Sequence, residues 1–367
     1  MEQLKTRQFA GIDLGRTSAQ FSLFDEGQGE MMEEIFPLEP DEQKEYIASG
    51  MAKIRQYMES ANRTWEDFDE VNISLEGVDQ ENRKTLEEQL PEDFQEIHAT
   101  SIITRFRAFA EYVFHQERSV WDRNTLLLDF SEGRLTYIFV EQIRRARQRA
   151  YRAILKEIDT EEFGIQEGDP ELDQNFSKMM KQFLVRKPAH IIYLTGQGFE
   201  GSWMKRSLTY MCAGRRVFLG QNLYANGACL LGMGELALIE DGMLLMEGPE
   251  MVSHTIGVIT QESGKAHYVP ITSIGKEWYN TSGSLDIIMD KSQKVEFFFH
   301  NSRENEIECS ACEIRDLPGR PPKTTRLRIK VEFTSQAAGV ILITDMGFGS
   351  MFPATGKVTI FPFQLIT

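Results

Sequence analysis

The sequence has few cysteines and no long apolar run, and each absence excludes a class of protein. Four cysteines in 367 residues are too few for a disulfide framework, so we expect a reducing, cytoplasmic environment. No apolar run approaches the ~20 residues that a membrane helix needs. The N-terminal MEQLKTRQF is too polar for a signal peptide. The sequence therefore predicts a cytoplasmic protein that has no membrane partner.

Basic residues are also in deficit. The chain has 40 lysines and arginines against 56 aspartates and glutamates, which gives a formal charge of −16. A negative field of this size repels nucleic acid, so we expect no nucleic-acid partner. The apolar share of 41% is ordinary for a globular protein, and the length predicts two or three domains.

The stretch 9–25, FAGIDLGRTSAQFSLFD, predicts a strand, a tight turn and a second strand. The turn holds the carboxylate of Asp13, a glycine at Gly15 and the hydroxyl of Thr17. Exposed N–H groups beside a glycine can cradle phosphate, and a carboxylate can hold the waters of a bound Mg²⁺. The alternative interpretation is an ordinary hairpin turn.

The same order returns in the second part of the chain. An apolar strand over 125–129, TLLLD, ends in Asp129, and a turn over 130–134 leads into another strand. Asp13 and Asp129 thus hold matching positions in two units, which predicts a duplicated α/β domain with a cleft between its halves. Two carboxylates that face one cleft suit a metal-bound polyphosphate.

Helical spacing and short apolar runs predict the other elements up to residue 240. A strand over 190–194 runs into a glycine-rich turn over 195–198. We further expect strands over 71–75 and 97–100, and helices over 41–60, 79–90, 103–115, 141–157, 169–185, 200–212 and 223–233.

Beyond residue 246 helical spacing vanishes and short strands take over. Their spacing predicts an antiparallel β-sandwich over 251–367. The segment 241–250 is an apolar linker that contains Met243-Leu244-Leu245-Met246, and we expect it to dock in a groove. The strands are expected over 252–260, 266–272, 284–289, 295–300, 306–314, 326–333, 339–344 and 357–365.

These motifs, in this order, resemble the actin-like ATPase superfamily, and more closely its seventy-kilodalton heat-shock chaperones. GIDLGRTSAQ resembles the first phosphate motif, and LLLDFSEGRLTYIFV stands where the second belongs. YLTGQGF resembles the adenosine motif, and NLYANGACLLG the small-residue helix after it. The MLLM linker and the β-rich tail resemble the interdomain linker and peptide-binding sandwich of those chaperones.

The resemblance implies a nucleotide-binding domain over 1–240 with ATP or ADP and Mg²⁺ in its cleft. Asp13 would hold Mg²⁺ through water, and Asp13 and Asp129 would be the catalytic carboxylates. The residues implied at the nucleotide are Gly15, Arg16 and Thr17 at the phosphates, Gly133 opposite them, and Gly196, Gln197 and Gly198 at adenosine.

Several residues depart from the family pattern. Ser131 and Glu132 replace glycines of the second phosphate loop. Glu132 would bring a negative charge close to a bound polyphosphate, and two like charges ~4 Å apart can cost up to ~4 kcal/mol. The stretch 101–104 lacks the acid that places the attacking water in those chaperones. Arg16 and Arg134 stand where the family favours threonine. These two arginines either neutralise the negative charge of the carboxylates and phosphates, or they are solvated turn residues.

Two functions follow from these residues and from the resemblance. The first is an ATP-binding, chaperone-like protein with slow or absent hydrolysis, whose β-sandwich holds a peptide or protein client. The second is a pseudo-ATPase scaffold that binds a partner and has lost nucleotide turnover. The arginine cluster over 144–152 is a solvated helix face, or it supplies an arginine that stacks on adenine.

Overall fold

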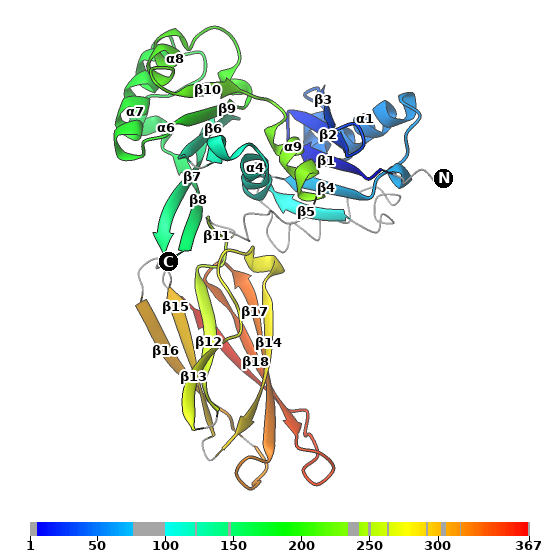
Figure 1. The fold of residues 1–367 in the computed structure, drawn as a ribbon, viewed down its shortest axis with the longest axis vertical. Coiled ribbons are helices and arrows are strands. Elements are labelled where there is room, and N and C mark those ends of the chain that lie inside the picture. Colours follow the sequence, from blue (N-terminus) through cyan, green and yellow to red (C-terminus); the bar gives the residue numbers. More distant parts are fainter. Residues whose placement is uncertain are drawn as a thin grey trace. The chain divides into compact units, whose positions relative to one another are not determined.

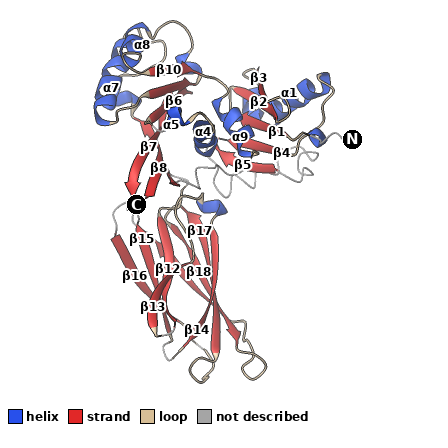
Figure 2. Cartoon of the chain, viewed as in Figure 1, coloured by secondary structure: helices blue, strands red, loops and turns tan. Residues whose placement is uncertain are grey.

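A computed structural model of the chain describes residues 6–75, 100–121, 123–145, 148–233, 242–248, 251–262, 264–290, 293–301, 306–315 and 317–365. The chain divides into two compact units, Met1–Leu244 and Leu245–Thr367. The first unit mixes helices and strands, and the second consists almost wholly of strands (Figure 2). The helix expected over 79–90 and most of the strand expected over 97–100 lie outside the described residues.

The first sheet of unit 1 contains three antiparallel strands followed by two parallel ones. Its order is β3-β2-β1-β4-β5, with β1 antiparallel to β2 and parallel to β4. One buried face of β1, β2 and β4 is apolar and forms part of the core, whereas the other buried face carries polar side chains such as Asp13, Ser22 and Ser74. Its strands are β1 (Gln8–Leu14), β2 (Ser18–Asp25), β3 (Glu30–Pro37), β4 (Glu70–Leu75) and β5 (Thr100–Thr104).

The second sheet repeats this order and these directions. Its order is β10-β9-β6-β7-β8-β11, with β6 antiparallel to β7 and parallel to β9. The apolar linker segment provides its sixth strand, β11, beside β8. The strands are β6 (Thr125–Ser131), β7 (Arg134–Arg145), β8 (Gln148–Ile158), β9 (Ile191–Thr195), β10 (Arg216–Leu219) and β11 (Gly242–Glu247).

The long helix expected over 141–157 was wrong, because the described residues of this range, 141–145 and 148–157, belong to strands β7 and β8. Tyr151 and Ala153 are buried on either side of the half-buried Arg152, which is the alternation of a strand. Ala153 pairs with Val140 on β7, so tertiary pairing overrode a local pattern that also fitted a helix. The corrected element is the third strand of the second sheet, which makes the two sheets more alike than the sequence indicated.

The other described helices agree more closely with the sequence. The helices expected over 41–60, 103–115, 169–185 and 223–233 are confirmed, whereas the one expected over 200–212 is shorter. The helices are α1 (Tyr46–Ser60), α4 (Arg105–Phe114), α5 (Arg118–Trp121), α6 (Thr160–Phe163), α7 (Leu172–Arg186), α8 (Lys205–Met211) and α9 (Leu223–Leu231).

Helices α4 and α9 lie between the two sheets of unit 1 (Figure 1). They approach unusually closely, since a Cβ at Gly227 of α9 would lie 1.8 Å from the carbonyl oxygen of Ala108 on α4. Gly11 of β1 is packed in the same way, with its Cβ position 2.0 Å from the carbonyl oxygen of Ala225. Only glycine permits these backbones to touch, and the contacts fix where the first turns of α4 and α9 point.

Unit 2 contains two four-stranded antiparallel sheets that share one core. Their orders are β13-β12-β15-β16 and β14-β17-β18-β19. Phe297 of the first sheet stacks on Phe361 of the second at 5.8 Å between ring centroids. All eight expected strands are confirmed. They are β12 (His254–Glu262), β13 (Lys265–Pro270), β14 (Ser282–Met289), β15 (Lys294–Asn301), β16 (Glu306–Glu313), β17 (Thr325–Ser335), β18 (Ala338–Gly347) and β19 (Val358–Gln364).

Candidate functional site

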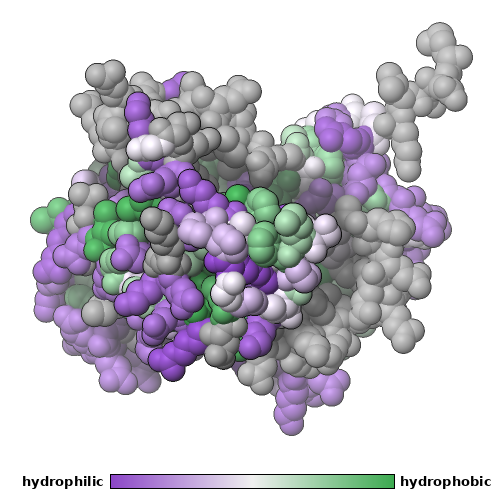
Figure 3. All heavy atoms as spheres, turned by 90° about the horizontal axis from the view of Figure 1, so that it is seen from below, coloured by the Kyte–Doolittle hydropathy of each residue, from purple (hydrophilic) through white to green (hydrophobic). Residues whose placement is uncertain are grey.

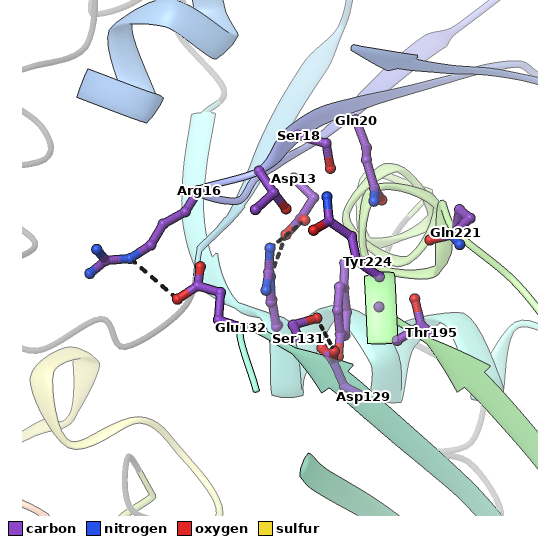
Figure 4. A pocket seen from close by; sticks show the side chains of 14 residues that line it. Asp13, Arg16, Ser18, Gln20, Asp129, Ser131, Glu132, Thr195, Gln221 and Tyr224 are labelled. Carbon is purple, nitrogen blue, oxygen red and sulfur yellow. Dashed lines mark hydrogen bonds and ion pairs between the residues drawn. The ribbon is translucent and has the colours of Figure 1, made fainter. Parts of the chain in front are cut away.

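The two aspartates singled out by the sequence line one small cavity in unit 1 (Figure 4). Asp13 is 1% exposed and Asp129 is 8% exposed. Each aspartate lies opposite a hydroxyl residue on the neighbouring parallel strand, Asp13 opposite Ser74 and Asp129 opposite Thr195. The cavity has a volume of about 40 Å³. Its other lining residues are Arg16, Thr17, Ser18, Gln20, Arg105, Ser131, Glu132, Gly196, Gln197, Gln221 and Tyr224.

Arg105, the first residue of α4, binds the carboxylate of Asp13 through two hydrogen bonds. Its Nε donates to Oδ1 at 3.0 Å and its Nη2 donates to Oδ2 at 2.9 Å. Ser74 Oγ also donates to Oδ1, at 2.5 Å. Burial disfavours the charged guanidinium, but the attraction of Asp13 and Asp129 outweighs burial and keeps the pKa of Arg105 above its usual value. Both oxygens of Asp13 are therefore engaged by a permanent cation.

Asp129 is held by two hydroxyl donors from its own half and from α9. Tyr224 Oη donates to Oδ2 at 2.7 Å, and Ser131 Oγ donates to Oδ1 at 2.5 Å. Burial and the neighbouring carboxylate raise the pKa of the Tyr224 hydroxyl well above its usual value. Arg105 lies over the ring of Tyr224, 5.1 Å from its centroid. The two aspartates are thus joined through Arg105 and Tyr224 into one polar network.

A third acidic side chain stands at the rim of the cavity. Glu132 forms an ion pair with Arg16 at 3.8 Å, and this pair spans the turns of the two halves (Figure 4). Glu132 has a positive φ of 53° and Gly133 has a φ of 72°, the backbone of a tight hairpin turn. The predicted charge of Glu132 near the phosphate position is offset here by Arg16.

The structure brings together some of the predicted site residues and separates others. Asp13, Arg16, Thr17, Asp129, Gly196 and Gln197 all line the cavity. Gly15, Gly133, Arg134 and Gly198 are not among its lining residues. Gly15 lies against Arg105, since its Cβ position is 2.4 Å from the guanidinium, and Gly198 packs against the ring of Phe130.

Sequence reasoning missed Arg105 and Tyr224, the two side chains that connect the aspartates. Arg105 follows directly on the stretch 101–104, where the family's acidic residue is absent. A cation at the first turn of a helix that leaves a buried strand is a weak signal, because such an arginine is usually solvated. The pairing of β1 with β4 and of β4 with β5 brings the residue after Thr104 to the end of the sheet where Asp13 lies, and this pairing is not visible in a local pattern.

The residues present do not fit the magnesium nucleotide that the family resemblance implies. Pockets for small-molecule ligands typically enclose ~300–1,000 Å³, far more than the cavity between these side chains. Arg105 occupies both oxygens of the carboxylate that would hold the waters of Mg²⁺. In the part of the chain that the structure describes, no group of three or more histidine, cysteine or acidic residues could hold a metal ion.

Among the described residues, no helix has both the length and the apolar character that crossing a bilayer requires.

The family comparison covers most of unit 1. The model described as the C-terminal part of a family of unknown function, DUF5716, matches residues 46–246. The chain belongs to this family. A second model, a domain of unknown function named DUF8552, matches residues 251–365. No curated protein matches the chain by sequence.

Solved structures give remote likenesses only. The activator of the 2-hydroxyisocaproyl-CoA dehydratase from Clostridium difficile is 11% identical, with a TM-score of 0.39 over 64% of this chain and 97% of that one. The ROK hexokinase from Thermus thermophilus is 12% identical, with a TM-score of 0.36 over 62% and 100%. The inorganic polyphosphate/ATP-glucomannokinase from Arthrobacter sp. strain KM is 13% identical, with a TM-score of 0.39 over 64% and 99%. Likenesses this remote assign neither a function nor a substrate to this chain.

Proposed function

We propose that this chain is a pseudo-ATPase scaffold: a duplicated actin-like domain without nucleotide turnover, followed by a β-sandwich that binds a peptide or protein partner. The shared strand order of the two sheets in unit 1 supports the duplication. The shared core of the two sheets in unit 2 supports the sandwich. The bidentate ion pair of Arg105 with Asp13 carries the proposal.

In the ion pair of Arg105 with Asp13, a side chain of the protein takes the place of a bound cation. A divalent cation could reach Asp13 only after Arg105 had moved, and this guanidinium would then lose its two hydrogen bonds to that carboxylate in a buried site. The charge of Glu132, which also lines the cavity, is paired with Arg16. The occupied carboxylate of Asp13 and the small volume of the cavity therefore act together against Mg-ATP.

The test is a melting experiment on the full chain with and without Mg-ATP. A ligand at 100 times its dissociation constant stabilises a protein by about 2.7 kcal/mol, which moves the melting temperature by several degrees. We expect no shift at millimolar Mg-ATP or Mg-ADP. A shift in the natural chain that the Asp13→Ala variant abolishes would overturn the proposal and restore the ATP-binding, chaperone-like alternative.

A further inference from the structure

Among the described strands, β16 (Glu306–Glu313) ends one sheet of unit 2 and is hydrogen-bonded on one side, to β15. Its first six residues are all exposed, and Cys312 is its only buried residue. An edge strand of this kind presents a row of unpaired backbone N–H and C=O groups to solvent. The backbone alone therefore makes this edge a template for another extended segment.

The opposite end of the other sheet shows how the fold covers an edge. Gly283 of the edge strand β14 packs against the backbone of Ile271, with its Cβ position 2.0 Å from the Ile271 carbonyl oxygen. Trp278 in the same connection is buried and belongs to the core. Among the described residues, no comparable segment packs against the Glu306–Ser310 part of β16.

The inward face of β16 is polar although its neighbour on β15 is part of the core. Glu308 pairs with Phe299 and Ser310 pairs with Phe297, and both phenylalanines are buried. Glu308 and Ser310 are nevertheless exposed, so this side of the sheet extends beyond the core. Phe361 of the facing sheet, which stacks on Phe297, is only half-buried.

The two faces of β16 alternate in chemistry. Glu306, Glu308 and Ser310 lie on one face, and Ile307, Cys309 and Ala311 lie on the other. Ile307 is 64% exposed. Within the part of the chain that the structure describes, neither Glu306 nor Glu308 has an ion-pair partner. Figure 3 shows small hydrophobic patches bordered by hydrophilic residues on the face seen from below.

We propose that β16 is a docking edge for an extended, basic segment of a partner protein, which adds to the sheet as a further strand. Lysines or arginines of this segment pair with Glu306 and Glu308, and apolar side chains at alternate positions cover Ile307 and Cys309. Charge complementarity selects this occupant, because an acidic chain such as a second copy is repelled by the same edge. The inference rests on the partner-binding role proposed above, but it does not depend on the state of the cavity.

The test uses the full chain and a labelled peptide of the same length as β16, with alternating lysine and valine. We expect it to bind at least about tenfold more tightly than a peptide with glutamate in place of lysine. Binding should weaken at ~1 M salt, where the Debye length is ~3 Å. Glu308→Lys should remove most of the preference, whereas Glu296→Lys, an exposed glutamate one strand inward, should change affinity less than about twofold.

Two outcomes overturn this inference. Equal binding of the basic and acidic peptides would mean that the edge pairs without regard to charge. No binding of either would mean that the glutamates serve to keep the edge free of partners, as charged edge residues do in many sheets. If the peptide fails while Mg-ATP still gives no melting shift, the docking edge is wrong and the pseudo-ATPase proposal stands. If the basic peptide binds as expected while Mg-ATP stabilises the chain, the docking edge stands and the pseudo-ATPase proposal is wrong.

Discussion

At the scale of single residues, one arginine decides how the cavity of unit 1 is interpreted. The two aspartates were predicted from sequence as metal and phosphate residues, and the structure places them around one cavity. Arg105 lies between them with 17% of its side chain exposed, and it neutralises the carboxylate on which metal binding depends. A site built to hold a metal would leave this carboxylate open.

Removing Arg105 should destabilise unit 1 more than removing an exposed arginine. The Arg105→Met variant leaves Asp13 buried without its cation, and such a change costs about 3–5 kcal/mol. Arg16→Met breaks an exposed pair and should cost less than about 1 kcal/mol. Urea denaturation of both variants measures the difference. Adding Asp13→Asn to Arg105→Met should recover part of the loss, and the absence of any recovery would contradict this account.

A second buried ion pair makes the stability of unit 2 depend on pH. Arg320 binds both oxygens of Asp345, at 2.7 and 2.9 Å, and the Gly347 N–H and the Thr355 hydroxyl also donate to this carboxylate. Burial opposes the charge of Asp345, but these hydrogen bonds outweigh burial and hold the pKa of this carboxyl below its usual range.

The lowered pKa fixes the sign of the pH effect. The stabilisation is fully present above the unfolded-state pKa of about 3.9 and is lost as the pH falls through the lower folded-state value. We therefore expect the urea concentration at the unfolding midpoint of unit 2 to decrease once the pH is lowered below about 4. In Arg320→Gln the midpoint should be lower at neutral pH and should depend less on acid. Parallel curves for the two proteins between pH 7 and pH 3 would rule out this role of Asp345.

At the scale of elements, the hairpin of β7 and β8 and the helix pair of α4 and α9 differ in what the local sequence could predict. The hairpin could not be recognised locally, because Ile143, Ile154 and Ile158 fit a helical face as well as a strand. The helices were predicted from spacing alone, but their close crossing at Gly227 could not be. Strand pairing and helix crossing are contacts between residues that are distant in sequence, so a local sequence pattern does not predict them.

The helix crossing can be tested with one methyl group. Gly227→Ala would normally favour a helix by up to ~1 kcal/mol. Here the added Cβ would lie 1.8 Å from the Ala108 carbonyl oxygen, which belongs to backbone and cannot move alone. We expect a net loss of about 1–3 kcal/mol in the stability of unit 1. Gly319→Ala, where a Cβ meets no atom within 4 Å, is the control, and equal midpoints for the two variants would contradict the tight crossing.

At the scale of the whole molecule, the chain divides into two units with separate cores. The core of unit 2 comes from its own strands, among them β12, β15, β17 and β18. Strand β11 spans the boundary between the two units and pairs with β8, so a fragment should begin after it. A domain with its own continuous core can fold alone.

We expect residues 251–367 to fold independently. The fragment should show a β-sheet circular dichroism spectrum and one cooperative melting transition. The Leu327→Ala variant, which truncates a fully buried core residue, should lower the stability of the fragment by about 2–5 kcal/mol. A fragment that stays unfolded or melts without cooperativity would show that unit 2 needs the rest of the chain.

The sequence by itself determined where most strands and helices lie, because periodicity and turn residues are local properties of the chain. It also identified Asp13 and Asp129, since a carboxylate after a buried strand is visible in one dimension. Only the tertiary structure decided what surrounds these aspartates. Arg105 lies 92 residues along the chain from Asp13, and its guanidinium reaches this carboxylate because strand pairing across β1, β4 and β5 brings the two together. Whether a carboxylate faces solvent or an internal cation depends on such long-range contacts, and these decide its chemistry.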